Sequence, residues 1–317
     1  MPKENILLES SILNKKIKQR VANLISESRF KREPPGQTNC EIKNSSGDIF
    51  KIDIFEDGND PKLSEIQNLF NETFKREEVE SEIFLRSAID GKTPWGTPDI
   101  KYRVISITNK EEELLTVCAG ATLELSDTDN EVAYCVEYLL TNKKLKQKGL
   151  AREVYISALI DSLKIAEEKN KKLSFLFGEC TDSSETFWNK MGWKRIYLKN
   201  KDTNKYIEVP YIQPVLNFNT ETGEKSKDSG EIKEHLMIDF LNREPTIKDL
   251  LKLHEALINY TAMWSKEAFK NEEAYEKHMS YINNLKLTFE KNITQEQYDK
   301  KLYFLSGEQK AHLNYNI

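Results

Sequence analysis

The chain has 317 residues, of which 38% are hydrophobic and 31% charged, enough for one large domain or two smaller ones. Its formal net charge of −5 argues against a general nucleic-acid binder, which would carry a basic excess. No stretch reaches the roughly 20 apolar residues that a membrane-spanning helix needs, and the N-terminus lacks the apolar segment of a secretory signal. We therefore expect neither nucleic acid nor a membrane among its partners.

The chain contains four cysteines, Cys40, Cys118, Cys135 and Cys180. They form no C-x-x-C pair, and none lies near a histidine at the spacing of a metal site. This pattern indicates reduced thiols in a cytoplasmic protein. The four histidines are scattered through the C-terminal third, so we predict no metal site.

The first third of the chain predicts helices and one strand. Residues 6–31 form a basic amphipathic helix, ended by the prolines and glycine of "KREPPGQT". Residues 48–57 alternate apolar and polar positions, as in a half-buried strand. A helix then opens at Pro61, and a second one follows over about 77–90.

The middle of the chain predicts a sheet with one long helix. Strands with hairpin-like separators are expected over residues 102–108, 113–125 and 131–140. Gly120, inside the second strand, suggests a bulge or a close approach of the backbone. A helix over about 150–168 precedes a nearly all-apolar strand over 173–180.

Shorter elements follow. The segment "SETFWNKMG" predicts a helix that Ser183 or Ser184 caps and Gly192 stops, and "WKRIYL" predicts a strand. Two more strands are expected over residues 206–216 and 234–241. From Thr246 onward the pattern is almost wholly helical. This order predicts an α/β (α+β) fold, with helices on both faces of a mixed sheet and a mainly helical C-terminal extension.

The stretch "LLTNKKLKQKGLAREV" joins a predicted strand to the long helix. Gly149 lies at the helix entry, where the first backbone N–H groups have no partner within the helix and the helix dipole favours an anion. Basic side chains surround this point, those of Lys144, Lys146, Lys148 and Arg152. The chemistry suits a phosphate or pyrophosphate. The alternative is a solvated basic turn.

This stretch resembles the acyl-CoA-binding motif [R/Q]-x-x-G-x-[G/A] of the GCN5-related N-acetyltransferase (GNAT) family. The matching residues are Lys146, Gln147, Lys148, Gly149, Leu150 and Ala151. Lys146 departs from the motif, because a lysine keeps the charge but lacks the planar fork of arginine. A second block, "SETFWNKMGWKRI", resembles the later helix and strand of that family. The resemblance covers roughly residues 48–200.

The resemblance implies a central sheet that splays open beside the strand over 131–140. In that family acyl-CoA lies in this opening, and its pantetheine arm pairs with the backbone at the strand end. The implied cofactor-binding residues are Leu139, Leu140, Thr141, Lys146, Gln147, Lys148, Gly149, Leu150, Ala151, Arg152 and Trp188. We predict an N-terminal helical segment over 1–45, a GNAT-like domain over 46–242 and a helical extension over 243–317.

Glu137 is the candidate general base for the amine that attacks the thioester. In a regular strand it shares its face with Cys135 and Leu139, and apolar neighbours would raise its carboxyl pKa. The alternative is an ordinary solvent-facing glutamate.

The resemblance does not supply a general acid, because Trp188 stands where the family often has a tyrosine. Tyr197, Tyr206 and Tyr211 are substitutes among which the sequence does not select, and Tyr197 is the one that we predict as the acid. Trp188 itself would pack against the thioether arm or serve as a core aromatic residue.

These features predict an acyl-CoA-dependent N-acyltransferase, with acetyl-CoA as co-substrate. The acceptor would be a small-molecule or peptidyl amine. The C-terminal helices would pack on the core, cover the substrate or form a homodimer surface. The alternative function is a GNAT-fold module that binds acyl-CoA or a protein partner without catalysis.

Overall fold

The computed structural model describes residues 14–33, 37, 39–91, 101–125, 130–142, 149–226, 232–241 and 243–305. The chain divides into two compact units. The first comprises Met1–Thr93 and Pro98–Ser174, and the second comprises Pro94–Thr97 and Phe175–Ile317.

The first unit contains six neighbouring strands of one sheet, and each neighbouring pair among these six is antiparallel. Its strands, in spatial and chain order, are β1 (Lys31–Glu33), β2 (Cys40–Lys43), β3 (Ile49–Phe55), β4 (Lys101–Thr108), β5 (Leu114–Glu124) and β6 (Glu131–Thr141). The four strands predicted here, β3 to β6, are confirmed. β1 and β2 are a correction, because the segment predicted to be only helical adds two strands to the sheet edge.

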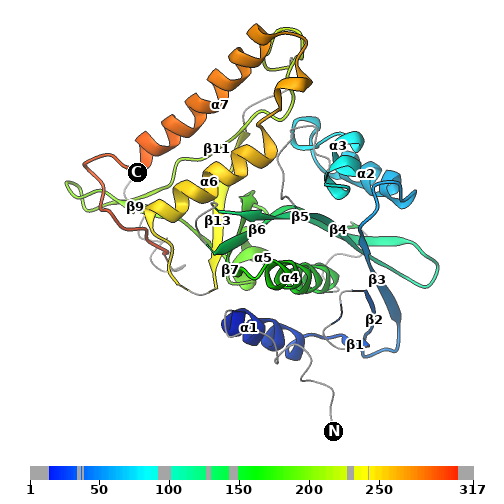
Figure 1. The fold of residues 1–317 in the computed structure, drawn as a ribbon. Helices are drawn as coiled ribbons and strands as arrows, with labels where there is room; N and C mark the ends of the chain where they lie inside the picture. The colour runs from blue at the N-terminus through cyan, green and yellow to red at the C-terminus, as the bar shows by residue number, and fades with distance from the viewer. Residues whose placement is uncertain are drawn as a thin grey trace. The chain divides into compact units, whose positions relative to one another are not determined.

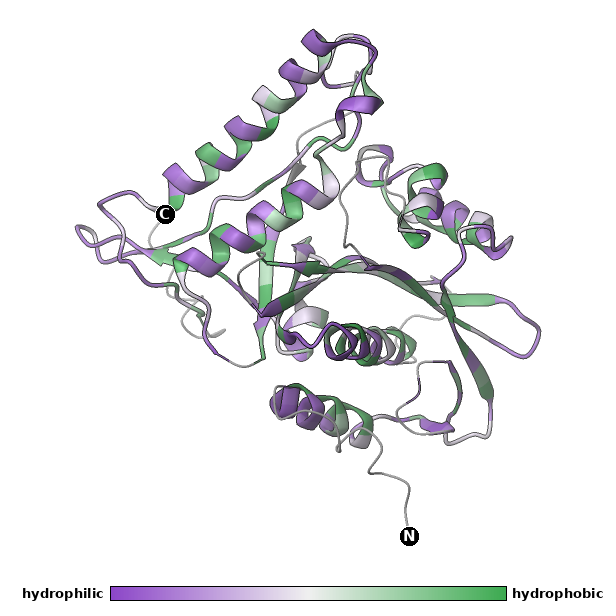
Figure 2. Ribbon diagram, viewed as in Figure 1, coloured by the Kyte–Doolittle hydropathy of each residue, from purple (hydrophilic) through white to green (hydrophobic). Residues whose placement is uncertain are grey.

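Helices cover both faces of this sheet (Figure 1). α2 (Lys62–Thr73) and α3 (Glu82–Ile89) lie on one face, and α4 (Leu150–Glu168) lies on the other. α1 (Lys15–Ser26) packs against α4, so α4 is enclosed between α1 and the sheet. A helix covered on both sides needs apolar residues around most of its surface, and α4 is mostly apolar (Figure 2). The helix predicted over 77–90 begins later, because Ser81 accepts a hydrogen bond from the Phe84 N–H and caps α3.

A buried ion pair and two hydrogen bonds tie the N-terminal segment to α4. The Arg32 guanidinium, on β1, lies 3.2 Å from the Glu153 carboxylate, with both side chains 1% exposed. Arg32 also donates to the Glu153 carbonyl oxygen at 2.7 Å and to the Ser157 hydroxyl at 3.0 Å. Glu153 lies in the first turn of α4, so this buried pair fixes the start of that helix.

A β-bulge interrupts the pairing of β5 with β6. Ala119 pairs with Tyr138 and Gly120 pairs with Val136, so Glu137 is one extra residue on β6. A Cβ at Gly120 would lie 2.2 Å from the backbone oxygen of Cys135, which is closer than any real contact. The predicted bulge and close backbone approach at Gly120 are both confirmed.

The second unit is built from short strands and two long helices. β13 (His235–Phe240) pairs antiparallel with β7 (Lys172–Cys180) through residues Phe175–Cys180, and with β8 (Lys194–Arg195). Two small sheets join β9 (Tyr197–Lys199) to β10 (Tyr206–Glu208), and β11 (Ile212–Gln213) to β12 (Ile232–Lys233). The strand predicted over 206–216 is therefore two short ones, since Pro210 and Pro214 lack the N–H of a ladder.

Helices dominate the end of the described chain. α5 (Glu185–Lys190) has Ser184 as its N-cap residue, and Gly192 follows it at φ 93°. α6 (Ile247–Thr261) begins with a capping box of Thr246 and Asp249, and α7 (Glu272–Ile293) packs against it. The mixed α/β fold class and the helical C-terminal region are confirmed. The predicted three-part division and the splay beside β6 stay predictions.

Candidate functional site

Gly149 forms the junction between the motif and α4. It is the N-cap residue, with φ +88° and ψ 0°, a left-handed conformation that favours glycine. A Cβ there would lie 3.6 Å from the nearest ring carbon of Phe30, so the backbone angle, and not lack of space, requires the glycine. Lys144, Lys146, Gln147 and Lys148 lie outside the described residues.

The first turn of α4 is anchored on its inner side. Leu150 is 2% exposed, and Ala151 is half-buried. The Arg152 guanidinium donates to the Leu24 carbonyl oxygen at 3.2 Å and to the Glu27 carboxylate at 2.9 Å. Arg152 thus links α4 to α1, and its predicted role in anion binding stays a prediction.

Glu137 lies at the bulge of β6 and is half-buried. The Tyr102 hydroxyl on β4 donates a hydrogen bond of 2.7 Å to its carboxylate. Burial first, and then the charge of Glu137, raise the pKa of Tyr102 well above its ordinary value. The phenol therefore stays protonated and remains a donor to the carboxylate.

The bulge corrects one expected neighbour of Glu137. Glu137 and Tyr138 stand together opposite Ala119, so both face the α2 and α3 side of the sheet. Leu139 pairs with Cys118, on the face where the Tyr134 hydroxyl lies 3.9 Å from the Cys118 sulfur. Leu139 is therefore on the opposite face from Glu137, while Cys135 shares the face of Glu137 as expected.

At the strand end predicted to bind pantetheine, some polar groups already form contacts with the neighbouring strand β5. The Thr116 hydroxyl donates to the Leu140 carbonyl oxygen at 2.5 Å and lies 3.0 Å from the Thr141 hydroxyl. Leu140 is buried, whereas Leu139 and Thr141 are half-buried. A ligand at this strand end would meet groups that β5 already orders.

A second carboxyl group, absent from the sequence prediction, lies beside Glu137. Glu80, between α2 and α3, is 4% exposed, and its Oε1 has no hydrogen-bond partner among the described residues. The Tyr138 hydroxyl accepts from the Glu80 N–H at 3.1 Å and donates to the Glu78 carbonyl oxygen at 3.0 Å. Glu80 lies within the acidic run "REEVESE", which resembles a solvated surface, so periodicity gave no sign of its burial.

The remaining predicted site residues belong to the second unit. Trp188 is 5% exposed, with its ring centroid 4.4 Å from that of Trp193, as in a core aromatic pair. Tyr197 is 6% exposed, and its backbone exchanges two hydrogen bonds of 2.9 Å with Tyr303. Burial raises the pKa of Tyr197 to about 12. The roles of Trp188 and Tyr197 toward acyl-CoA stay predictions.

The alternative tyrosines also have structural contacts. The Tyr211 hydroxyl donates to the Glu179 carboxylate, and the Tyr206 ring packs edge-on against Tyr303.

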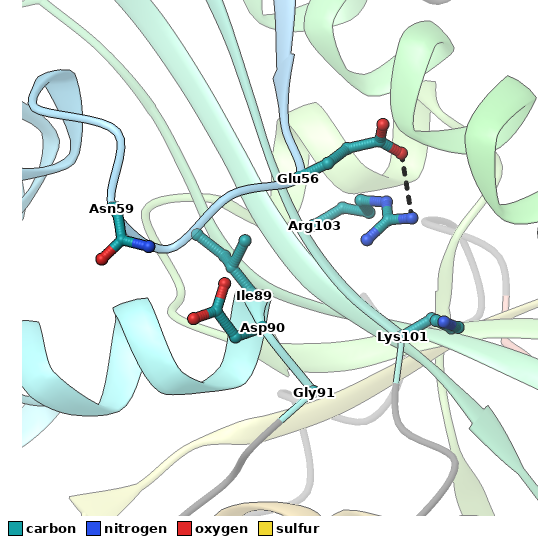
Figure 3. Close-up of a pocket in the computed structure, with 7 residues that line it drawn as sticks. All are labelled: Glu56, Asn59, Ile89, Asp90, Gly91, Lys101 and Arg103. Atoms are coloured by element: carbon teal, nitrogen blue, oxygen red, sulfur yellow. Dashed lines mark ion pairs between the residues drawn. The ribbon is translucent and has the colours of Figure 1, made fainter.

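A separate charged pocket of about 500 Å³ opens in the first unit (Figure 3). Its lining residues are Glu56, Asn59, Ile89, Asp90, Gly91, Lys101 and Arg103. Figure 3 shows the Arg103 guanidinium paired with Glu56, at 3.1 Å. None of the residues predicted from the sequence lines this pocket.

All four cysteines are free and buried, and burial raises the pKa of the Cys118 thiol to about 12. Over the part of the chain that the structure covers, no three His, Cys, Asp or Glu side chains gather as metal ligands. Within the same ranges, no helix is long and apolar enough to cross a membrane.

No protein-family model and no curated protein sequence matches the chain. Among solved structures, it is similar to an aminoglycoside acetyltransferase from an uncultured soil metagenomic sample, at 13% identity and a TM-score of 0.34, over 45% of this chain and 85% of that one. It is also similar to Arabidopsis thaliana NAA60, at 9% identity and a TM-score of 0.38, over 61% of this chain and 99% of that one.

A third similar structure is the ribosomal-protein-S18-alanine N-acetyltransferase from Escherichia coli, at 12% identity and a TM-score of 0.35, over 62% of this chain and 96% of that one. The matches include acetyltransferases of the GNAT family, which the sequence motifs resemble. At these identities and TM-scores, the likeness carries no conclusion about activity or ligands.

Proposed function

We propose that this protein is an acyl-CoA-dependent N-acyltransferase of the GNAT type, with acetyl-CoA as its co-substrate. The observation that carries the proposal is Gly149, left-handed at the start of α4, the helix that follows the strand that holds Glu137. An anion at that helix start would meet backbone N–H groups and the positive end of the helix dipole. The motif from Lys146 to Ala151 supplies the family resemblance.

In the proposed reaction, Glu137 accepts a proton from the ammonium form of the acceptor, directly or through a water, and leaves a neutral amine. The amine nitrogen then forms a bond to the thioester carbonyl carbon, and the carbon–sulfur bond breaks. The nitrogen releases its second proton to solvent, the thiolate gains one from the proposed acid, and solvent reprotonates that acid, so the products are an amide and a free thiol. Tyr197 is the proposed acid for the thiolate.

The acceptor is proposed to be a small-molecule or peptidyl amine. The four buried free thiols suit a reducing compartment, and we propose the cytoplasm.

The test is binding of acetyl-CoA by calorimetry, followed by release of free thiol in the presence of a library of primary amines and peptides. Binding with turnover supports the enzyme. Binding without turnover across the library supports instead the rival function of a non-catalytic acyl-CoA-binding module. Absence of CoA binding contradicts both.

Gly149→Asp tests the anion site itself. The new carboxylate would stand at the helix start, so we expect CoA affinity to fall about 100-fold or more. Gly149→Asn is the matched control, because asparagine tolerates the left-handed conformation and has the same shape without the charge. Equal affinities for both variants and the wild type would contradict the proposed site.

Glu137→Gln separates catalysis from binding. Loss of the base should lower kcat about 100-fold while CoA affinity changes less than about twofold. Stopped-flow turnover and calorimetry on the same preparation measure the two quantities. An unchanged kcat would remove Glu137 from the mechanism.

A further inference from the structure

Glu80 is an unusual residue to find buried. Glutamates are rarely this enclosed unless a cation or several hydrogen-bond donors meet the carboxylate. Here Oε1 has no partner among the described residues, and the side chain is 4% exposed. A buried ionisable group beside a second carboxyl group is a candidate for a functional role.

The groups around Glu80 come from three elements. Glu137 and Tyr138 face it from β6, and Tyr102 faces it from β4. Arg76 lies in the 3₁₀ turn Arg76–Glu78, where its side chain is exposed and its guanidinium donates to the Val79 carbonyl oxygen at 3.4 Å. Among the described groups that act on the Glu80 carboxyl, the charge of Glu137 opposes its ionisation and the exposed Arg76 favours it.

This imbalance determines where the proton resides. Burial, and then the negative charge of Glu137, raise the pKa of Glu80 well above its ordinary value, and Arg76 opposes them weakly. Glu137 differs because it is half-buried and receives a hydrogen bond from the Tyr102 hydroxyl, which stabilises its ionised form. Two nearby carboxyl groups in unequal surroundings favour one proton on the more buried member.

We propose that Glu80 and Glu137 form a carboxyl pair that holds one proton at neutral pH, with Glu80 as the proton-bearing member, and that the pair receives its acceptor as an ammonium cation. This inference deepens the proposed acyltransferase and, for the acceptor, rests on it. Glu80 is a positioning residue, because it is enclosed and acts through Glu137. The pair carries a single negative charge, which a cationic amine neutralises and a neutral or anionic acceptor does not.

The proton inventory of one turnover follows from this arrangement. The ammonium gives its proton to Glu137, so that both carboxyl groups are briefly neutral, and Glu137 then returns that proton to solvent. Glu80 keeps its own proton throughout. Because Glu80 stays neutral, Glu137 does not face a second buried charge when it ionises again.

The stability of the protein tests the pair without any ligand. A carboxyl whose pKa is raised in the folded state stabilises the fold fully only below its unfolded pKa, here 4.5, and loses that contribution as the pH rises toward the folded value. One such proton changes the folded-to-unfolded ratio about tenfold per pH unit. Glu80→Gln removes it.

We therefore expect the ratio of unfolding constants, wild type over Glu80→Gln, to rise about tenfold per pH unit in urea titrations from about pH 5.5 upward, until Glu80 ionises in the folded state. Glu72→Gln, an exposed glutamate on α2, is the matched control and should show no such slope. A flat ratio for Glu80→Gln overturns the pair. If that variant does not fold, the wild type labelled with ¹³C at its glutamate carboxyl carbons gives the same answer. One resonance should titrate well above the others, and its absence overturns the pair.

The kinetic test uses primary alkylamines as acceptors and compares kcat/KM of wild type and Glu80→Gln across pH. The ratio should be constant with pH at acidic and neutral pH, where Glu80 holds its proton and glutamine resembles the protonated acid. It should depart by about threefold or more once Glu80 ionises. A purely structural role gives a ratio independent of pH and overturns the positioning role.

The two hypotheses can fail separately. If the proposed function is wrong, the wild type does not bind CoA or shows no turnover, while the pH dependence of the stability ratio is still present.

Discussion

Glu80 in the first unit and Asp249 in the second are similarly buried, at 4% and 6% exposed, yet their carboxyl pKa values move in opposite directions. Burial acts to raise the pKa of Asp249, but hydrogen bonds from Arg243 and Thr246 outweigh it and lower the pKa to about 2. Glu80 has no such donors at Oε1 within the described chain and faces the charge of Glu137. The partners, more than the depth, decide whether a buried acid is ionised.

The carboxyl pKa of Asp161, on α4, lies between those of Glu80 and Asp249. It is 8% exposed and has one guanidinium nearby, with the Arg103 Nε at 3.5 Å from its carboxylate. Burial raises its pKa to about 6 in spite of Arg103. The three carboxyl groups thus form a series, in which the pKa falls as the number and quality of the donors rise.

His254 in the second unit extends the comparison to a buried base. Among these buried groups, we expect it to have the largest effect on how the free energy of unfolding changes with pH. Burial, and then the charge of Lys286, lower its pKa from 6.5 to about 3, and its ring stacks on Phe289 with centroids 3.7 Å apart. The folded state holds it neutral, so its contribution is present above pH 6.5 and is lost as the pH falls toward 3. This loss amounts to about 4–5 kcal/mol.

His254→Phe should therefore reduce the acid sensitivity of the second unit. Urea titrations at pH 7 and pH 4, with hydrogen exchange of α6 as a local reading, measure the change. An acid sensitivity equal to that of the wild type would show that His254 is charged or exposed when folded.

Asp161→Asn should change the pH dependence of stability by an intermediate amount, and in the opposite direction to His254, because Asp161 destabilises the fold at high pH and not at low pH. The pKa of Asp161 is raised when folded, so its stabilising contribution is full below pH 3.8 and is lost as the pH rises through about 6. Above pH 7 the asparagine variant should be more stable than the wild type by about 1–2 kcal/mol, after allowance for the weakened pairing of Arg103. Thermal unfolding at pH 8 and pH 5 checks this, and a gain at pH 5 as large as that at pH 8 would contradict it.

Asp249→Asn should have the smallest effect. The lowered pKa means that the stabilisation is present above pH 3.8 and is lost as the pH falls through about 2. The Arg243 side chain is 40% exposed, so solvent screens the pair, and we expect a loss of about 1 kcal/mol at pH 7. Denaturant midpoints measure it, with Thr246→Ala as a comparison for loss of the cap alone. A gain in stability for Asp249→Asn would place Asp249 with Glu80 as an acid that burial leaves neutral.

The sequence predicted the elements whose signals are local. β4, β5, β6 and α4 follow from apolar patterns and turn residues, and their observed bounds lie close to the predicted ones. Gly120 and Gly149 stand out in the sequence because a glycine inside a strand or at a helix entry often marks a backbone geometry that other residues resist. Both positions have such a geometry in the structure, a close backbone approach at Gly120 and a left-handed conformation at Gly149.

The features that the sequence did not predict depend on distant partners. β1 and β2 are three and four residues long, too short for a periodic pattern, and Arg32 on β1 is buried where Glu153 and Ser157 of α4 meet it. Glu80 stands in an acidic run that looks solvated, and the aromatic residues that enclose it come from other parts of the chain. The face of Leu139 was predicted wrongly because a regular alternation was assumed across a strand that contains a bulge.

That bulge divides β6 into two segments of opposite parity. Before it, even-numbered positions such as Tyr134 face the α4 side, and after it the even-numbered Tyr138 faces the α2 side. Substitution of Glu137 removes a carboxylate and preserves this parity. Deletion of the same residue would restore one continuous alternation, and because Val136 and Tyr138 already face opposite sides, every downstream side chain would keep its present face. A sequence that lacks one residue at this point could therefore keep both cores, so the place of a gap in this strand carries as much structural information as the identity of its residues.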